Sequence, residues 1–117
     1  MTYQEAFELI ATHSEAFKMF PEKLKKDRLF FLEAMKWAVG GGLDSGFEYA
    51  DKILKNDRSF VLEAAKIDGF IIQDINEIFK KDKEIVLQAI KTSGKTIAHL
   101  IDGSLKDDPD VLKLLKK

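Results

Sequence analysis

Residues 54–66 read LKNDRSFVLEAAK, and the same pattern recurs as LKKDRLFFLEAMK at 24–36 and FKKDKEIVLQAIK at 79–91. A shortened version, LKDDPDVL, follows at 105–112. The intervals between the aspartates of these four segments are 30, 25 and 26 (57 − 27, 82 − 57 and 108 − 82). An internal period of this size is typical of helical repeat architectures.

Each repeated aspartate is well placed to cap the N-terminus of a helix. The four residues are Asp27, Asp57, Asp82 and Asp108. A carboxylate at this position accepts hydrogen bonds from the unpaired amides of the first helical turn. Pro109 supports the interpretation, because proline is favoured at the first position of a helix. We therefore predict that a helix begins directly after each of these aspartates.

The apolar spacing predicts an all-α fold with two helices in each copy. From Asp57 onward, apolar residues recur at helical spacing, and Gly69 and Gly94 fall where a left-handed residue is expected after a helix end. A second helix is predicted to follow each glycine, carrying Ile71, Ile72, Ile75, Ile78 and Phe79 in one copy and Ile97, Leu100 and Ile101 in the next. The expected architecture is stacked antiparallel helix pairs of about 25 residues each, with about nine short helices in all.

The period divides the chain, predicted to be one domain over residues 1–117, into successive copies. We expect a half-copy at 1–23, copies at 24–53, 54–78 and 79–104, and a partial copy at 105–117. The copy at 24–53 is the longest, and the Gly40–Gly42 segment accounts for its extra residues. We interpret these glycines as a flexible connector, because they lack the Gly-Lys-Ser/Thr ending of a phosphate loop. The alternative is a hinge or a ligand contact flanked by Trp37 and Phe47.

The repeated motif, Leu-Lys-x-Asp-Arg/Lys-x-x-Val-Leu-x-Ala-x-Lys followed by a glycine and a second apolar helix, resembles the helical repeat known as domain of unknown function 4116. The resemblance covers about residues 24–112 and is clearest at 54–66 and 79–91. It implies repeated helical pairs, often in tandem within larger bacterial or protist proteins, some of them effector-like. It implies no established activity and brings no catalytic residues.

Composition and charge exclude several classes of protein. With 19 basic and 20 acidic side chains the net charge is −1, which gives no long-range attraction for nucleic acid or an anionic membrane. The chain contains no cysteine, so no disulfide framework or thiolate zinc site is expected. The start of the chain does not resemble a signal peptide, and no apolar run reaches the ~20 residues that span a bilayer. We expect a soluble, cytoplasmic protein, with delivery into a host cell left open.

The basic corners beside the repeated aspartates are the most prominent polar feature. Cations next to a helix N-terminus could hold a phosphate, for instance that of a nucleotide, because backbone amides and the helix dipole already favour an anion there. The candidate phosphate-binding residues are Arg28, Lys55, Arg58, Lys80 and Lys83. The alternative, which we favour, is that the capping aspartates occupy these N-termini and pair with the cations.

No catalytic or metal-binding constellation is present in the sequence. His13 and His99 are the only histidines, and neither has a second ligand at metal-binding spacing on the same helix turn. Ser93 and Ser104 lie near His99 in sequence, but no nucleophile elbow surrounds them. We therefore predict no catalytic residues, no metal and no cofactor.

Aromatic residues crowd the first third of the chain. Phenylalanine at helical spacing is usually core material, yet Phe17, Phe20 and Trp37 could exceed what a small core needs and form an exposed partner surface. Together with the lack of catalytic groups, this favours a non-enzymatic interaction module that binds a protein partner. The alternatives are a module that binds a nucleotide or other phosphate compound at the basic corners, and a structural spacer within a longer repeat protein.

Overall fold

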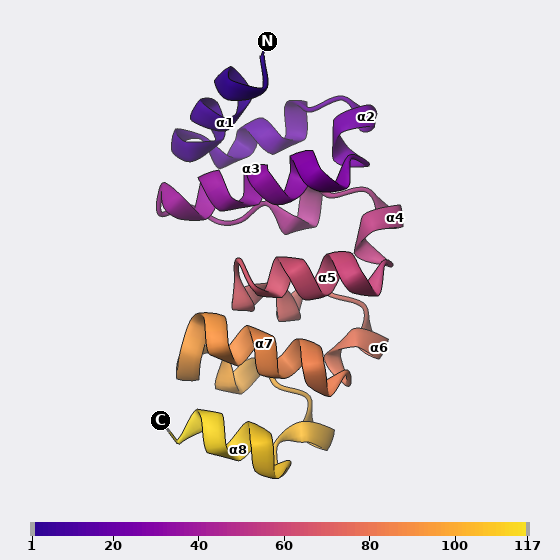
Figure 1. The fold of residues 1–117 in the computed structure, drawn as a ribbon, viewed down its shortest axis with the longest axis vertical. Coiled ribbons are helices and arrows are strands. Elements are labelled where there is room, and N and C mark those ends of the chain that lie inside the picture. The colour runs from indigo at the N-terminus through magenta and orange to yellow at the C-terminus, as the bar shows by residue number, and fades with distance from the viewer. Residues whose placement is uncertain (1, 117) are drawn as a thin grey trace. The chain divides into compact units, whose positions relative to one another are not determined.

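The computed structural model describes residues 2–116, except for the side chain of Ser14, and all of its regular elements are helical. Eight α-helices and five 3-10 helices are formed, and no strand is present in this range, which confirms the predicted all-α class (Figure 1). None of these helices is long and apolar enough to cross a membrane. The chain divides into two compact units, Met1–Lys55 and Asn56–Lys117. The boundary between the units lies close to the predicted start of the copy at 54–78.

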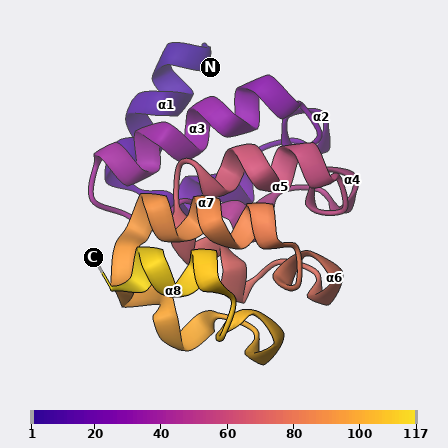
Figure 2. The ribbon, with the colours of Figure 1, turned by 60° about the horizontal axis from the view of Figure 1, so that its bottom comes forward.

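Each unit contains long α-helices alternating with shorter elements. Unit 1 consists of α1 (Tyr3–Thr12), η1 (Ser14–Met19), α2 (Glu22–Lys25), α3 (Arg28–Gly40), η2 (Phe47–Tyr49) and α4 (Lys52–Lys55). Unit 2 consists of α5 (Arg58–Ala65), η3 (Gly69–Gln73), α6 (Glu77–Lys80), α7 (Lys83–Ser93), η4 (Gly94–Leu100), η5 (Gly103–Leu105) and α8 (Pro109–Leu115). Within unit 1, α1 packs against α3, and within unit 2, α7 packs against both α5 and α8 (Figures 1 and 2).

The four aspartates cap helices as predicted. Asp27 accepts a hydrogen bond from the amide of Phe30 at 3.0 Å, and α3 begins at the next residue after Asp27. The other three side chains each accept bonds from two first-turn amides of α5, α7 and α8, at 2.9 to 3.4 Å. Pro109 is the first residue of α8. The recurring helix starts are therefore defined by local side-chain chemistry.

Residues 2–25 contain the same order of elements as a later part of the chain. Thr2 precedes Asp27 by the same interval that separates Asp57 from Asp82 (27 − 2 and 82 − 57). It caps α1 through a capping box with Glu5, in which the Glu5 amide donates to the Thr2 hydroxyl at 3.1 Å. Helix α1 is followed by a 3-10 helix and a short α-helix, as α5 is. The aspartate motif does not identify this copy, because a threonine rather than an aspartate caps its helix.

The second member of each predicted pair is not one α-helix. In residues 69–80 it is η3 followed by the one-turn helix α6. The carboxylate of Asp68 accepts from the amide of Phe70, and the side chain of Asn76 accepts from the amide of Ile78. A second capping residue inside the segment competes with continuous α-helical bonding, so two short helices form.

Gly69 is required for close packing and does not adopt the predicted left-handed conformation. The glycines with positive φ are Gly42, Gly46 and Gly94; the prediction is wrong for Gly69, and Gly94 has a positive φ of 68° with a ψ of −157°, outside the left-handed helical region. A β-carbon at Gly69 would lie 2.3 Å from the carbonyl oxygen of Ala89 and 2.6 Å from the hydroxyl of Ser93. The absence of a side chain allows η3 to approach α7 closely.

The three consecutive glycines end α3 in a defined geometry. The amide of Gly42 donates to the carbonyl of Val39, and the amide of Leu43 donates to the carbonyl of Ala38, both at 3.0 Å. With a φ of 80° at Gly42, this is a Schellman motif. A β-carbon at Gly41 would lie 2.0 Å from the carbonyl oxygen of Ala11 in α1, so this glycine permits the contact between the two helices.

Replacing Gly69 with alanine should destabilise unit 2 by about 1–3 kcal/mol, because the added methyl group overlaps backbone of α7. Gly103→Ala in the same unit is the matched control, since nothing lies within 4 Å of the position of its added β-carbon. Urea unfolding followed by circular dichroism measures both. Equal stabilities of the two variants would contradict the close approach of η3 to α7.

Candidate functional site

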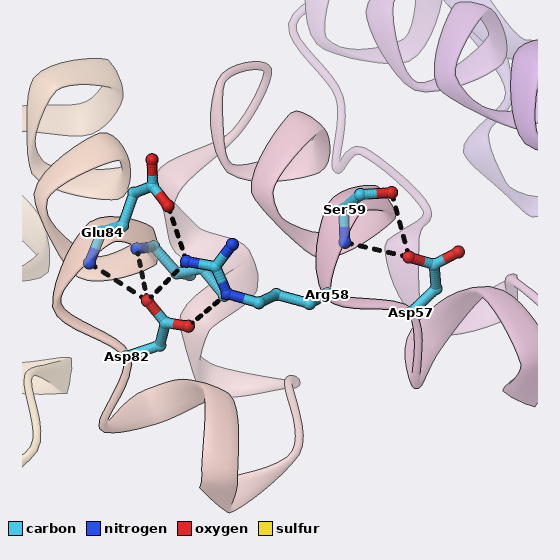
Figure 3. A network of polar contacts seen from close by, with 6 residues as sticks. Asp57, Arg58, Ser59, Asp82 and Glu84 are labelled. Carbon is cyan, nitrogen blue, oxygen red and sulfur yellow. Dashed lines mark hydrogen bonds and ion pairs between the residues drawn. The ribbon is translucent and has the colours of Figure 1, made fainter.

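The cation at the start of α5 binds the capping residue of α7. Arg58 is the first residue of α5, and its guanidinium donates to the two carboxylate oxygens of Asp82 at 2.6 and 3.1 Å. It also donates to Glu84 at 2.6 Å (Figure 3). Asp82 therefore has two roles at once: it caps its own helix and receives the cation of the preceding one. We call this arrangement the cap-and-cation contact.

The same contact joins α7 to α8. Lys83, the first residue of α7, lies 3.2 Å from the carboxylate of Asp108 and 2.7 Å from that of Asp110. Asp108 caps α8, and Asp110 holds the same position in α8 that Glu84 holds in α7. Unit 2 thus repeats one rule: the cation after one cap binds the next cap and the acidic residue two positions beyond it.

These contacts shift the pKa values of the paired groups in the directions that stabilise the charged forms. The hydrogen bonds that Arg58 donates to Asp82 and Glu84 raise the pKa of Arg58, and the bond from Arg58 lowers the pKa of Asp82 below its usual value. The hydrogen bonds to Asp110 and Asp108 raise the pKa of Lys83. All three groups are therefore charged near neutral pH.

The candidate phosphate-binding cations are mostly engaged by groups of the chain itself. Arg58 and Lys83 are in the contacts just described, and Lys80 lies 3.1 Å from Glu77 within α6. The ammonium of Lys55 donates to the carbonyl of Glu48, and Arg28 is the first residue of α3. At the starts of α3, α5 and α7, the capping carboxylate already accepts the amides that an anion would need. A bound phosphate would have to displace these carboxylates.

Two of the three aromatic residues predicted to form a partner surface lie in the core of unit 1. Phe17 is 0% exposed and Phe20 is 7% exposed. Their rings contact each other with centroids 5.7 Å apart, and Phe17 also contacts Phe31 at 5.3 Å. Trp37 is half-buried and stacks on Phe7. The aromatic cluster is thus mainly internal packing, and the prediction of an exposed surface at Phe17 and Phe20 is corrected.

Unit 1 nevertheless carries an apolar groove of about 300 Å³ between α1, η1 and the start of α2. It is lined by Thr2, Tyr3, Ala6, Leu9, Ala16, Met19, Phe20, Pro21 and Leu24. Two large apolar side chains stand exposed at its edge, Tyr3 at 55% and Met19 at 80%. Phe20 forms part of its buried floor. We call this feature the N-terminal groove.

Tyr3 and Met19 were not among the residues predicted to form a site. These two residues stand out when the copies are aligned on their capping residues. Tyr3 follows Thr2 as Arg58 follows Asp57, and Met19 has the same offset from Thr2 as Asp74 has from Asp57 (19 − 2 and 74 − 57). Two positions that are charged in the copy capped by Asp57 are therefore apolar and exposed in the first copy, which is capped by Thr2. The stability of the repeat does not require apolar side chains there.

Within residues 2–116 no three histidine, aspartate or glutamate side chains are grouped so that they could hold a metal ion. Unit 1 also has a shallow depression at Trp37, Gly40 and Gly41, beside the glycine segment discussed above. Its polar neighbours are Glu33 and Lys36 from the same helix, α3.

The structure thus defines an all-α protein built from acid-capped helices that recur along the chain. Models of the family described as domain of unknown function (DUF4116) match residues 45–80 and 57–103, and the chain belongs to this family. The match includes the caps of α5 and α7 and the cap-and-cation contact between them. No curated protein and no solved structure matched the chain at a significant level.

Substitutions of Asp82 should separate its two roles. Asp82→Ala removes both the cap and the ion pair and should lower the stability of unit 2 by about 1–2 kcal/mol. Asp82→Asn keeps a capping side chain and loses only the ion pair, so its cost should stay within about 1 kcal/mol. Thermal unfolding at neutral pH measures both, and equal losses would mean that the cap contributes nothing.

The ion pair between Arg58 and Asp82 predicts that the stability of the protein depends on pH. Because the pKa of Asp82 is lowered in the folded state, its ion pair stabilises the protein fully above the unfolded value of about 4. This contribution is lost as the pH falls through the folded pKa. The stability difference between wild type and Asp82→Asn should therefore shrink below about pH 4. A difference that stays constant down to pH 2, about two units below the unfolded pKa, would contradict the ion pair.

Proposed function

We propose that this chain is a non-enzymatic interaction module that binds a protein partner through the N-terminal groove. The observation that carries the proposal is the exposure of Tyr3 and Met19 at the edge of an apolar groove. Burying a side chain such as that of methionine contributes about 1.5–3 kcal/mol, so a partner that covers this edge gains apolar contact at little cost in polar desolvation. Exposed apolar groups gathered at a groove are typical of interaction sites.

The distribution of charge supports the same choice of surface. The cations of unit 2 that a charged ligand would use are held by Asp82, Glu84, Asp108 and Asp110. The lining of the groove, in contrast, contains no charged side chain. A protein side chain of apolar character fits this surface better than a nucleotide or phosphate does.

Partner capture with groove variants tests the proposal. We expect tagged full-length chain to retain one or more proteins from an extract of its source cells, and Met19→Asp to lose them, because a carboxylate at the edge of the groove opposes apolar docking. The matched control is Leu29→Asp, since Leu29 is 78% exposed in the same unit but does not line the groove. Retention of the same proteins by all three chains would show that the groove is not the docking site.

A further inference from the structure

The 3-10 helix η3 occupies a defined seat within unit 2. It packs against α7 and also against η4, the 3-10 helix that follows α7. The amide of Gly69 donates to the hydroxyl of Ser93 at 2.8 Å, and Ile71 and Ile72 are each only 1% exposed. Because η3 also packs against α5, its two adjacent branched side chains are buried between elements of unit 2.

The N-terminal groove is the corresponding surface of the first copy. It is lined by α1, η1 and the start of α2, and α1 and η1 are the counterparts of α7 and η4. Leu9 has the same offset from the cap Thr2 as Ala89 has from Asp82 (9 − 2 and 89 − 82). Ala89 is fully buried where η3 approaches it, whereas Leu9 is half-buried and lines the groove. The groove is therefore lined by the counterparts of the two elements that η3 packs against in unit 2.

We propose that the N-terminal groove binds a one-turn 3-10 helix from a helical repeat of another chain, with two adjacent branched apolar side chains as in η3. This inference rests on the proposed function, and it names the class of partner. The correspondence between copies supports it, because inside unit 2 the elements equivalent to α1 and η1 are covered by η3.

The docked segment is held by apolar contact rather than by ions. In unit 2, the contact between successive copies includes the ion pairs of Arg58 with Asp82 and Glu84. The corresponding positions of α1 are Thr2 and Gln4, which carry no charge. A partner therefore gains nothing from a cation at this point, and its affinity depends little on ionic strength.

A synthetic peptide with the sequence of residues 68–76, DGFIIQDIN, with blocked ends, is the direct probe. Titrated into the 15N-labelled full-length chain, it should shift the amide signals of Tyr3, Leu9 and Met19 in a saturable way. Met19→Asp should weaken this binding about tenfold or more, and Leu29→Asp should leave it unchanged. Raising sodium chloride from about 50 to 500 mM should change the affinity less than about twofold.

A peptide with aspartate in place of both adjacent isoleucines is the matched control and should cause no shifts at the groove. The inference is overturned if the parent peptide leaves the groove signals unchanged at about 2 mM, where millimolar affinity would still be detected. It is equally overturned if the shifts lie only in unit 2, or if the control peptide binds as well as the parent. Partner capture that depends on Met19 would then still stand, so failure of this inference is distinguishable from failure of the proposed function.

Discussion

The fold of unit 2 depends on a carboxylate that serves two helices. Asp82 accepts the unpaired amides at the start of α7 and receives the guanidinium from the start of α5. Because both groups belong to first turns, the contact brings two helix starts together; α5 and α7 also pack against each other, and they run in the same direction (Figure 1). The chain must then return from the end of α5 to the start of α7, and η3 and α6 form this connection. The repeat of about 25 residues is one long helix together with its return path.

The parts of this arrangement that rest on local chemistry could be predicted from the sequence. An aspartate followed by helical apolar spacing specifies a helix start, and all four such starts were predicted. The return path was predicted as a second α-helix because Ile71, Ile72, Ile75 and Ile78 are compatible with helical spacing. Asp68 caps the start of that segment and Asn76 caps a helix within it, so two shorter elements form. Periodicity alone does not show which of the two effects prevails.

The candidate site depends on tertiary packing and was predicted less well. Phe17 and Phe20 were predicted to exceed what the core needs, yet both are buried in unit 1. The ring of Phe17 fits because Gly46 has no side chain: a β-carbon there would lie 2.3 Å from the ring. The groove that remains is lined by residues from three elements, and its exposed edge is formed by Tyr3 and Met19. Neither residue belongs to a recognisable motif. Each stands out only when its copy is aligned on Thr2, a cap that the aspartate motif does not include.

The first copy is joined to the second by a different chemistry from that of unit 2. Tyr3 takes the position of Arg58 and Lys83, and its ring contacts that of Phe30 with centroids 4.9 Å apart. Phe7 extends this contact by packing on both Phe30 and Trp37. An aromatic contact has no proton to gain and is little affected by salt, whereas Asp82 and Asp108 lose their charge in acid. The substitution of tyrosine for a cation thus keeps α1 against α3 and leaves the adjoining edge of α1 apolar, which is the property that a docking surface needs.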